Sequence, residues 1–129
     1  MLMRVRPEQV DALARAAVET FEDNIAAHLR RVWPDETGEM TDEALYEWVR
    51  WGARFGARYG VETEYDVGRL CDLMFLYGAE LDQHPAIPWA RETLESEGLD
   101  GRQKVDLMME RAREDLDAMA AALSDDEVH

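Results

Sequence analysis

The clearest structural signal in the sequence is the stretch PEQVDALARAAVETFEDNIAAHLRRVW at residues 7–33. Its apolar residues recur every three or four positions, which is the spacing of one face of an α-helix. They are Val10, Leu13, Ala14, Ala17, Val18, Phe21, Ile25, Leu29 and Val32. Proline and glutamate at the start of the stretch suit the first turn of a helix. Because Pro34 disfavours helical geometry at Trp33, we predict one long helix over residues 7–33, which serves as the spine of a bundle.

The same spacing continues along the chain and predicts further helices. Thr41 and Thr63 are suitable N-caps, and Gly60 and Gly78 are suitable residues for ending the helices that follow. Residues 79–88 are predicted as a loop. Pro88 then opens a short fourth helix that Gly98 closes, and an amphipathic last helix covers about 102–123.

No stretch alternates apolar and polar residues for long enough to predict a β-strand. The predicted fold class is therefore all-α, a single-domain bundle of four to five helices with a long N-terminal helix and an amphipathic C-terminal helix. The domain is expected over residues 1–123, followed by an acidic flexible tail at 124–129.

Gly52, Gly56 and Gly60 form a row with a spacing of four in the second predicted helix. A glycine inside a helix costs about 1 kcal/mol relative to alanine, so the row predicts that a neighbouring helix packs very closely there. Two alternatives stay open at this point. The helix ends early near Phe55, or the row is a surface through which copies of the chain associate.

The charge of the chain restricts its partners. The 129 residues carry 29 acidic and 14 basic side chains, a formal net charge of −15. Residues 1–60 contribute −3 and residues 61–129 contribute −12. A field of this sign repels phosphate, which disfavours nucleic acid and anionic membranes, and it attracts basic proteins. The hydrophobic content of 47% is too high for a disordered chain.

Catalytic and metal-binding patterns do not emerge from the sequence. The single cysteine, Cys71, lies on an apolar helix face and excludes an internal disulfide. The three histidines lack the spacing of a metal site, and no glycine-rich phosphate loop is present. No apolar run approaches the length of a membrane span, and no secretory signal is recognised. We therefore expect a cytoplasmic, non-enzymatic protein without cofactor or metal.

Two surfaces are candidates for binding a protein partner. The first consists of an arginine row with an adjacent tryptophan on the second helix, namely Arg50, Trp51, Arg54 and Arg58. Exposed tryptophan and arginine are frequent in interfaces. The alternative is that these arginines pair with acids of the same chain, such as Glu43 and Glu47. The second surface is the acidic face of the last helix, with Asp106, Glu110 and Glu114, and its alternative is an ordinary solvated face.

The middle of the chain resembles a family of small helical proteins encoded in bacterial type VI secretion effector loci. The resemblance rests on Tyr59-Gly60 followed by an acidic helix start, on Gly78, on Pro88-Trp89, and on the earlier Trp33-Pro34. It covers residue 3 to about residue 95, and the chain departs from the pattern at Leu81, where phenylalanine is frequent. No catalytic residues are assigned in the family, so none are transferred. The resemblance implies an accessory role through contact with an effector or spike component.

Two functions from different classes follow as expectations. The first is an adaptor or chaperone-like partner of a type VI secretion effector or spike component. The second is an acidic immunity protein that neutralises a basic toxin such as a nuclease, with the acidic C-terminal half as its binding surface. Association between copies of the chain is compatible with either function.

Overall fold

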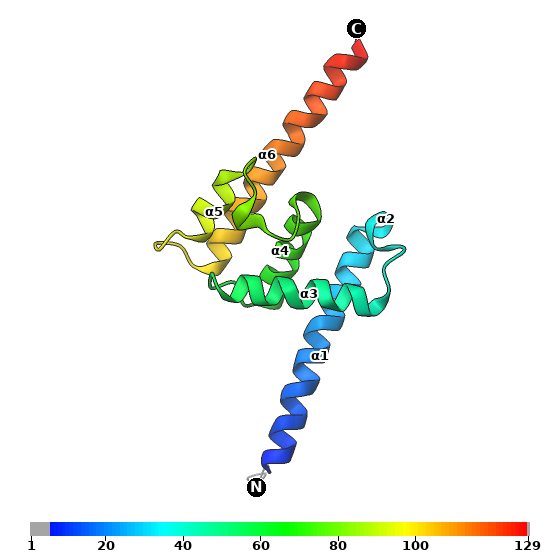
Figure 1. The fold of residues 1–129 in the computed structure, drawn as a ribbon, viewed down its shortest axis with the longest axis vertical. Coiled ribbons are helices and arrows are strands. Elements are labelled where there is room, and N and C mark those ends of the chain that lie inside the picture. Colours follow the sequence, from blue (N-terminus) through cyan, green and yellow to red (C-terminus); the bar gives the residue numbers. More distant parts are fainter. Residues whose placement is uncertain (1–5, 129) are drawn as a thin grey trace. The chain divides into compact units, whose positions relative to one another are not determined.

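The regular structure of the protein is helical throughout the described residues. The computed structural model describes residues 6–128, with side chains through Ser124. Its elements are α1 (Pro7–Val32), α2 (Pro34–Thr37), α3 (Asp42–Ala57), α4 (Glu64–Tyr77), the 3₁₀ turn η1 (Leu81–Gln83), α5 (Pro88–Leu94) and α6 (Gly101–Val128) (Figure 1). The prediction of an all-α helical bundle with a long N-terminal helix is confirmed.

The contacts between residues divide the chain into two compact units, Met1–Arg50 and Trp51–His129. The boundary falls inside α3. The first unit therefore holds α1, α2 and the start of α3, and the second unit holds the end of α3 with all later elements. The expectation of one domain over residues 1–123 stays a prediction.

In the first unit, a small core forms where the end of α1 meets α2 and the start of α3. Arg30 organises the connection between these helices, because its guanidinium donates to the carbonyl oxygens of Thr37 (2.9 Å) and Met40 (3.1 Å) and to the carboxylate of Asp42 (2.8 Å). The sequence predicts a short polar loop from Asp35 to Met40, and this prediction is wrong at its start, where α2 continues to Thr37. Proline fits the first turn of a helix, and the hydroxyl of Thr37 bonds back to the preceding turn, so the short helix α2 forms.

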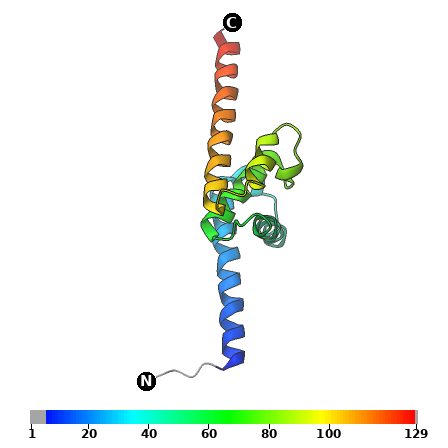
Figure 2. The ribbon, with the colours of Figure 1, turned by 90° about the vertical axis from the view of Figure 1, so that its left-hand side faces the viewer.

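No element described in the first unit covers the first half of α1, and Figures 1 and 2 show it extending away from α2. Val10, Leu13 and Val18 are 52%, 65% and 57% exposed, whereas Ile25 and Leu29 are buried. The predicted role of this helix as the spine of a bundle therefore applies only to its second half within this unit. The periodicity correctly predicts the helix, but only its second half is covered.

In the second unit, α4 is the most buried helix, as its nearly continuous apolar sequence predicts. Leu70, Cys71 and Met74 are fully enclosed, and α6 and η1 pack against this helix. The hydroxyl of Thr63 accepts the backbone N–H of Asp66 and caps the helix, which confirms the predicted N-cap.

The segments that follow α4 differ from the sequence prediction in two places. The loop predicted at residues 79–88 contains the 3₁₀ turn η1. The last helix runs to Val128, past the predicted end at Leu123, so the expected tail at 124–129 is helical over its described residues. His129 lies outside the described residues. Helix ends are weakly determined by sequence when no glycine or proline follows, as here after Leu123.

Gly52, Gly56 and Gly60 have different structural roles. A Cβ atom at Gly52 would lie 2.5 Å from Sγ of Cys71, so α3 and α4 approach closely there. A Cβ atom at Gly56 would lie 2.7 Å from the carbonyl oxygen of Val61. At Gly60 the prediction of a contact that excludes a side chain is wrong, because a Cβ atom there would have no described atom within 4 Å; the φ of +79° instead allows the chain to turn. Gly52 and Gly56 therefore serve packing inside the chain.

Candidate functional site

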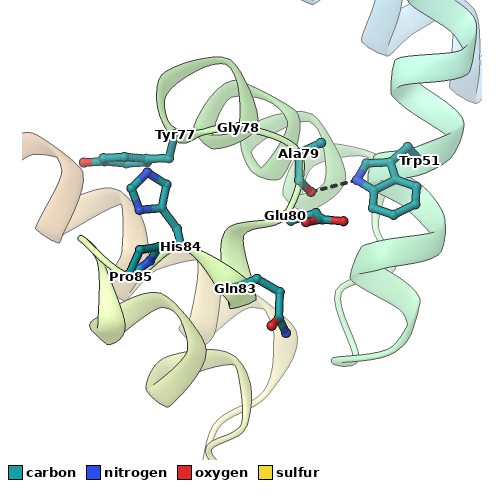
Figure 3. Close-up of a pocket in the computed structure, with 8 residues that line it drawn as sticks. All are labelled: Trp51, Tyr77, Gly78, Ala79, Glu80, Gln83, His84 and Pro85. Carbon is teal, nitrogen blue, oxygen red and sulfur yellow. Dashed lines mark hydrogen bonds between the residues drawn. The ribbon is translucent and has the colours of Figure 1, made fainter.

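An open groove of about 590 Å³ lies in the second unit. We call it the aromatic groove. Its lining comes from the end of α3, the end of α4, the linker after α4, and the segment around η1. The lining residues are Trp51, Tyr77, Gly78, Ala79, Glu80, Gln83, His84 and Pro85 (Figure 3). The groove thus combines three rings, a proline and one carboxylate.

A single hydrogen bond fixes the indole at one end of the aromatic groove. Nε1 of Trp51 donates to the carbonyl oxygen of Ala79 at 2.7 Å, and the side chain is half-buried (Figure 3). Gly78, with a φ of +104°, turns the chain directly before this carbonyl. The sequence singled out Trp51 because it lies off the apolar face of its helix, and the structure places it in this groove.

Tyr77 and His84 form the other end of the groove. The ring of Tyr77 contacts the rings of His84 and Trp89 edge to face, with centroid distances of 6.3 Å and 5.7 Å. Its hydroxyl donates to Asp115 at 2.9 Å, and burial together with this bond raises the pKa of Tyr77 to about 12. Nδ1 of His84 accepts the backbone N–H of Ala86, so the neutral ring carries its proton on Nε2.

Glu80 supplies the one carboxylate of the groove. Figure 3 shows it beside the indole of Trp51, on the side that faces the groove. The side chain is exposed, and its carboxylate forms no ion pair or hydrogen bond with any side chain described between residues 6 and 124. No arginine or lysine lines the groove, so this negative charge is uncompensated there.

The predicted arginine row does not form one free positive patch. Arg50 donates two 3.0 Å bonds to Glu22 and one 3.2 Å bond to Glu47, and the bonds to Glu22 raise its pKa. Arg58 lies over the ring of Phe55. All three arginines are exposed, and Arg54 forms no ion pair or hydrogen bond with a described side chain. The alternative of pairing with the chain's own acids holds for Arg50.

Arg58 and Asp82 also come together, at 4.0 Å, in a second polar cluster. Asp82 is buried and accepts a 2.6 Å hydrogen bond from the hydroxyl of Tyr59. Burial and this bond raise the pKa of Tyr59 to about 12. Nζ of Lys104 donates to the carbonyl oxygen of Tyr59 at 2.9 Å. This places a cation just past the C-terminal end of α3, where positive charge is favourable.

The acidic surface predicted on the last helix is exposed, and two of its three members have ion-pair partners. Asp106 accepts a 2.7 Å bond from Arg69, and Glu114 lies 3.8 Å from Arg111. Glu110 is exposed on the same helix. The surface is therefore partly neutralised by neighbouring arginines.

The sequence analysis missed a buried carboxylate, Asp66, at the start of α4. It accepts hydrogen bonds from Thr63 (2.7 Å), Arg69 (2.8 Å) and Arg102 (2.6 Å). Burial raises the pKa of Asp66, but these hydrogen bonds outweigh burial and hold its pKa below the ordinary value. Both guanidinium groups also lie within 5 Å of the ring centroid of Tyr65. The cluster joins α4 to α6.

The chain matches no protein-family model, and no curated protein or solved structure shows significant similarity to it. Among the described residues, no group of three or more histidine, cysteine or acidic side chains is placed to hold a metal ion.

None of the helices that the structure describes is long and apolar enough to pass through a membrane.

Proposed function

We propose that the protein is a non-enzymatic accessory protein of the cytoplasm that binds an effector or spike component of a type VI secretion locus. The sequence resemblance supports the assignment to a type VI secretion locus. The exposed apolar helix faces support a function that works by binding another protein. The observation on which the proposal rests most directly is the apolar row at the end of α6.

This apolar row continues a face that is buried earlier in the same helix. Val105, Met108 and Ala112 pack in the core of the second unit. Leu116, Met119 and Leu123 continue the row at the same spacing but are 47%, 61% and 64% exposed. Figures 1 and 2 show this part of α6 extending beyond α4 and α5. Exposed apolar rows on regular helices are typical of protein interaction sites.

The first unit repeats the feature independently. The first half of α1 carries Val10, Leu13 and Val18 exposed, whereas the same apolar face is buried at Ile25 and Leu29. Isolated helical segments shorter than about 12–15 residues are marginally stable in water. A partner that covers the exposed parts of α1 and α6 would therefore stabilise both segments. A protein that presents such faces is suited to holding another polypeptide.

The proposal predicts stable co-purification with the product of a neighbouring effector or spike gene. The double substitution of Leu116 and Met119 by serine should weaken retention by about tenfold or more, because burying each apolar side chain against a partner contributes about 1.5 kcal/mol or more. Co-expression followed by affinity purification and quantitative binding measures the effect. The matched control replaces Ala118 and Ala121, exposed on the opposite side of α6, with serine.

Retention that is equal in both double variants would contradict the role of the apolar row. Absence of any retained effector or spike protein would contradict the accessory function itself. The second candidate function, neutralisation of a basic toxin, is favoured by the net charge of −12 in residues 61–129. It requires an association rate that falls steeply with salt, whereas apolar docking does not.

A further inference from the structure

The chemistry of the aromatic groove fits a cationic side chain. Its lining offers the indole of Trp51 and the unpaired carboxylate of Glu80 at one end, and it holds no arginine or lysine of its own. We propose that this groove takes an arginine side chain presented by the protein partner, with the guanidinium over the indole and paired with Glu80. The inference rests on the proposed function and names the chemistry by which a partner is recognised.

The indole is held in place before any partner arrives. The bond from Nε1 of Trp51 to the carbonyl oxygen of Ala79 fixes the ring, which leaves its exposed area facing the groove (Figure 3). Tryptophan is the strongest aromatic acceptor for a cation over its face, and arginine combines this stacking with hydrogen bonds to a carboxylate. A fixed ring loses little entropy on binding.

The carboxylate of Glu80 is available because it has no partner among the described side chains, and two arginines of this unit are engaged elsewhere. Arg58 lies against Phe55 and Asp82, and Arg91 bonds to Glu95 at 3.0 Å. The net charge of −12 in residues 61–129 adds a field that draws cations to this unit. The same field repels a second copy of the chain, so a basic segment of another protein is the favoured occupant.

Two further groups of the groove suit the backbone that carries the arginine. Nε2 of His84 is a donor in the neutral ring, because Nδ1 already accepts the N–H of Ala86. The exposed amide of Gln83 supplies both a donor and an acceptor. An extended peptide lying across the groove can therefore bond through its backbone while the arginine occupies the Trp51 end.

The indole N–H signals in a two-dimensional NMR spectrum test the proposal on the intact protein. The chain has four tryptophans, and the signal lost in Trp51→Phe identifies that of Trp51. A short capped peptide of glycine, serine and alanine with one central arginine should shift this signal in a saturable way. Replacing the arginine with citrulline, which has the same shape without the charge, should weaken binding by about tenfold.

The variant Glu80→Gln should weaken binding of the arginine peptide by about tenfold. Glu62→Gln makes the same change in net charge at an exposed position outside the groove lining and should leave binding within about twofold. Both glutamates are exposed, so neither substitution is expected to affect folding. A Trp51 signal that does not move, equal binding of the citrulline peptide, or equal effects of the two glutamine variants would overturn the proposal.

Failure of this inference is distinguishable from failure of the proposed function. If the effector or spike protein is retained equally by Glu80→Gln and by the unchanged chain, the arginine site is wrong and the accessory function stands. If the arginine peptide binds as described and no effector or spike protein is retained, the site is correct and the assigned partner class is wrong. A second copy of the chain could instead place its own Arg54 in the groove, and sedimentation of the unchanged chain and of Arg54→Gln tests this alternative. A dimer that is lost in Arg54→Gln would overturn another protein as the proposed occupant.

Discussion

Replacing Asp66 with asparagine is expected to lower the free energy of unfolding by about 3 kcal/mol. The side chain of Asp66 is 3% exposed and neutralises Arg69, whose side chain is also largely buried. Without the carboxylate, the guanidinium of Arg69 keeps its desolvation cost and loses the more buried of its two carboxylate partners, while the exposed Asp106 remains. Arg102 is half-exposed and can return to water, so the estimate stays at the lower end of the range for broken buried ion pairs.

The effect should depend on pH in a defined direction. The pKa of Asp66 in the folded protein lies below its ordinary value of 3.8. The stabilisation is therefore fully present above that ordinary value and is lost as the pH falls through the folded pKa. Urea unfolding of the variant and the unchanged chain should differ at pH 7 and converge at pH values well below 3.8.

The control for Asp66 is Asp106→Asn, which removes another partner of the same arginine. Asp106 is more than half exposed, so this change should cost about 1 kcal/mol or less. If the two asparagine variants are equally stable, the buried carboxylate does not have the proposed importance.

The second large effect is expected for Gly101→Ala, with a loss of about 3 kcal/mol of folding free energy. A Cβ atom at Gly101 would overlap the carbonyl oxygen of Gly60 and would lie 2.8 Å from its carbonyl carbon and 3.0 Å from Cα of Val61. All three neighbours are backbone atoms, which cannot move aside by changing a rotamer. The start of α6 would have to shift away from the turn after α3.

Gly98→Ala is the matched control for Gly101→Ala, three residues earlier in the chain. No described atom lies within 4 Å of a Cβ at Gly98, and its backbone is outside the left-handed region. Alanine at such a position should leave stability unchanged or raise it by about 0.5 kcal/mol. Thermal and urea unfolding of both variants measure the difference, and a Gly101→Ala protein as stable as Gly98→Ala would contradict the close approach.

The helices were largely predictable because their determinants are local. Each determinant lies within a few residues of the helix start or helix face that it determines. These determinants are the threonine caps, the prolines that start α2 and α5, and the apolar spacing. The sequence also predicted that Gly52 lies at a close helix contact, since glycine inside a helix is costly without one. Burial along α1 was not predictable, because the periodicity shows which face is apolar but not whether another element covers it.

The aromatic groove could be anticipated only in part. Trp51 was noticed from its angular position on its helix, whereas Glu80 and His84 lay in a stretch predicted as a loop. Trp51 and the residues of this loop come together through the turn at Gly78 and the bond from the indole to the carbonyl of Ala79. Ala79 is 28 residues from Trp51 along the chain. The pairing of Arg50 with Glu22 has the same separation, so a local reading of charges suggested Glu43 and Glu47 and did not find Glu22.

The enclosed position of Lys104 has a consequence for how opening of this unit can be observed. It is the one lysine in the sequence, it is 8% exposed, and its amine is bonded to the carbonyl of Tyr59. Amine-directed acylation at this position requires the start of α6 to separate from the turn after α3. The rate at which Lys104 is acylated therefore reports how often this local opening occurs.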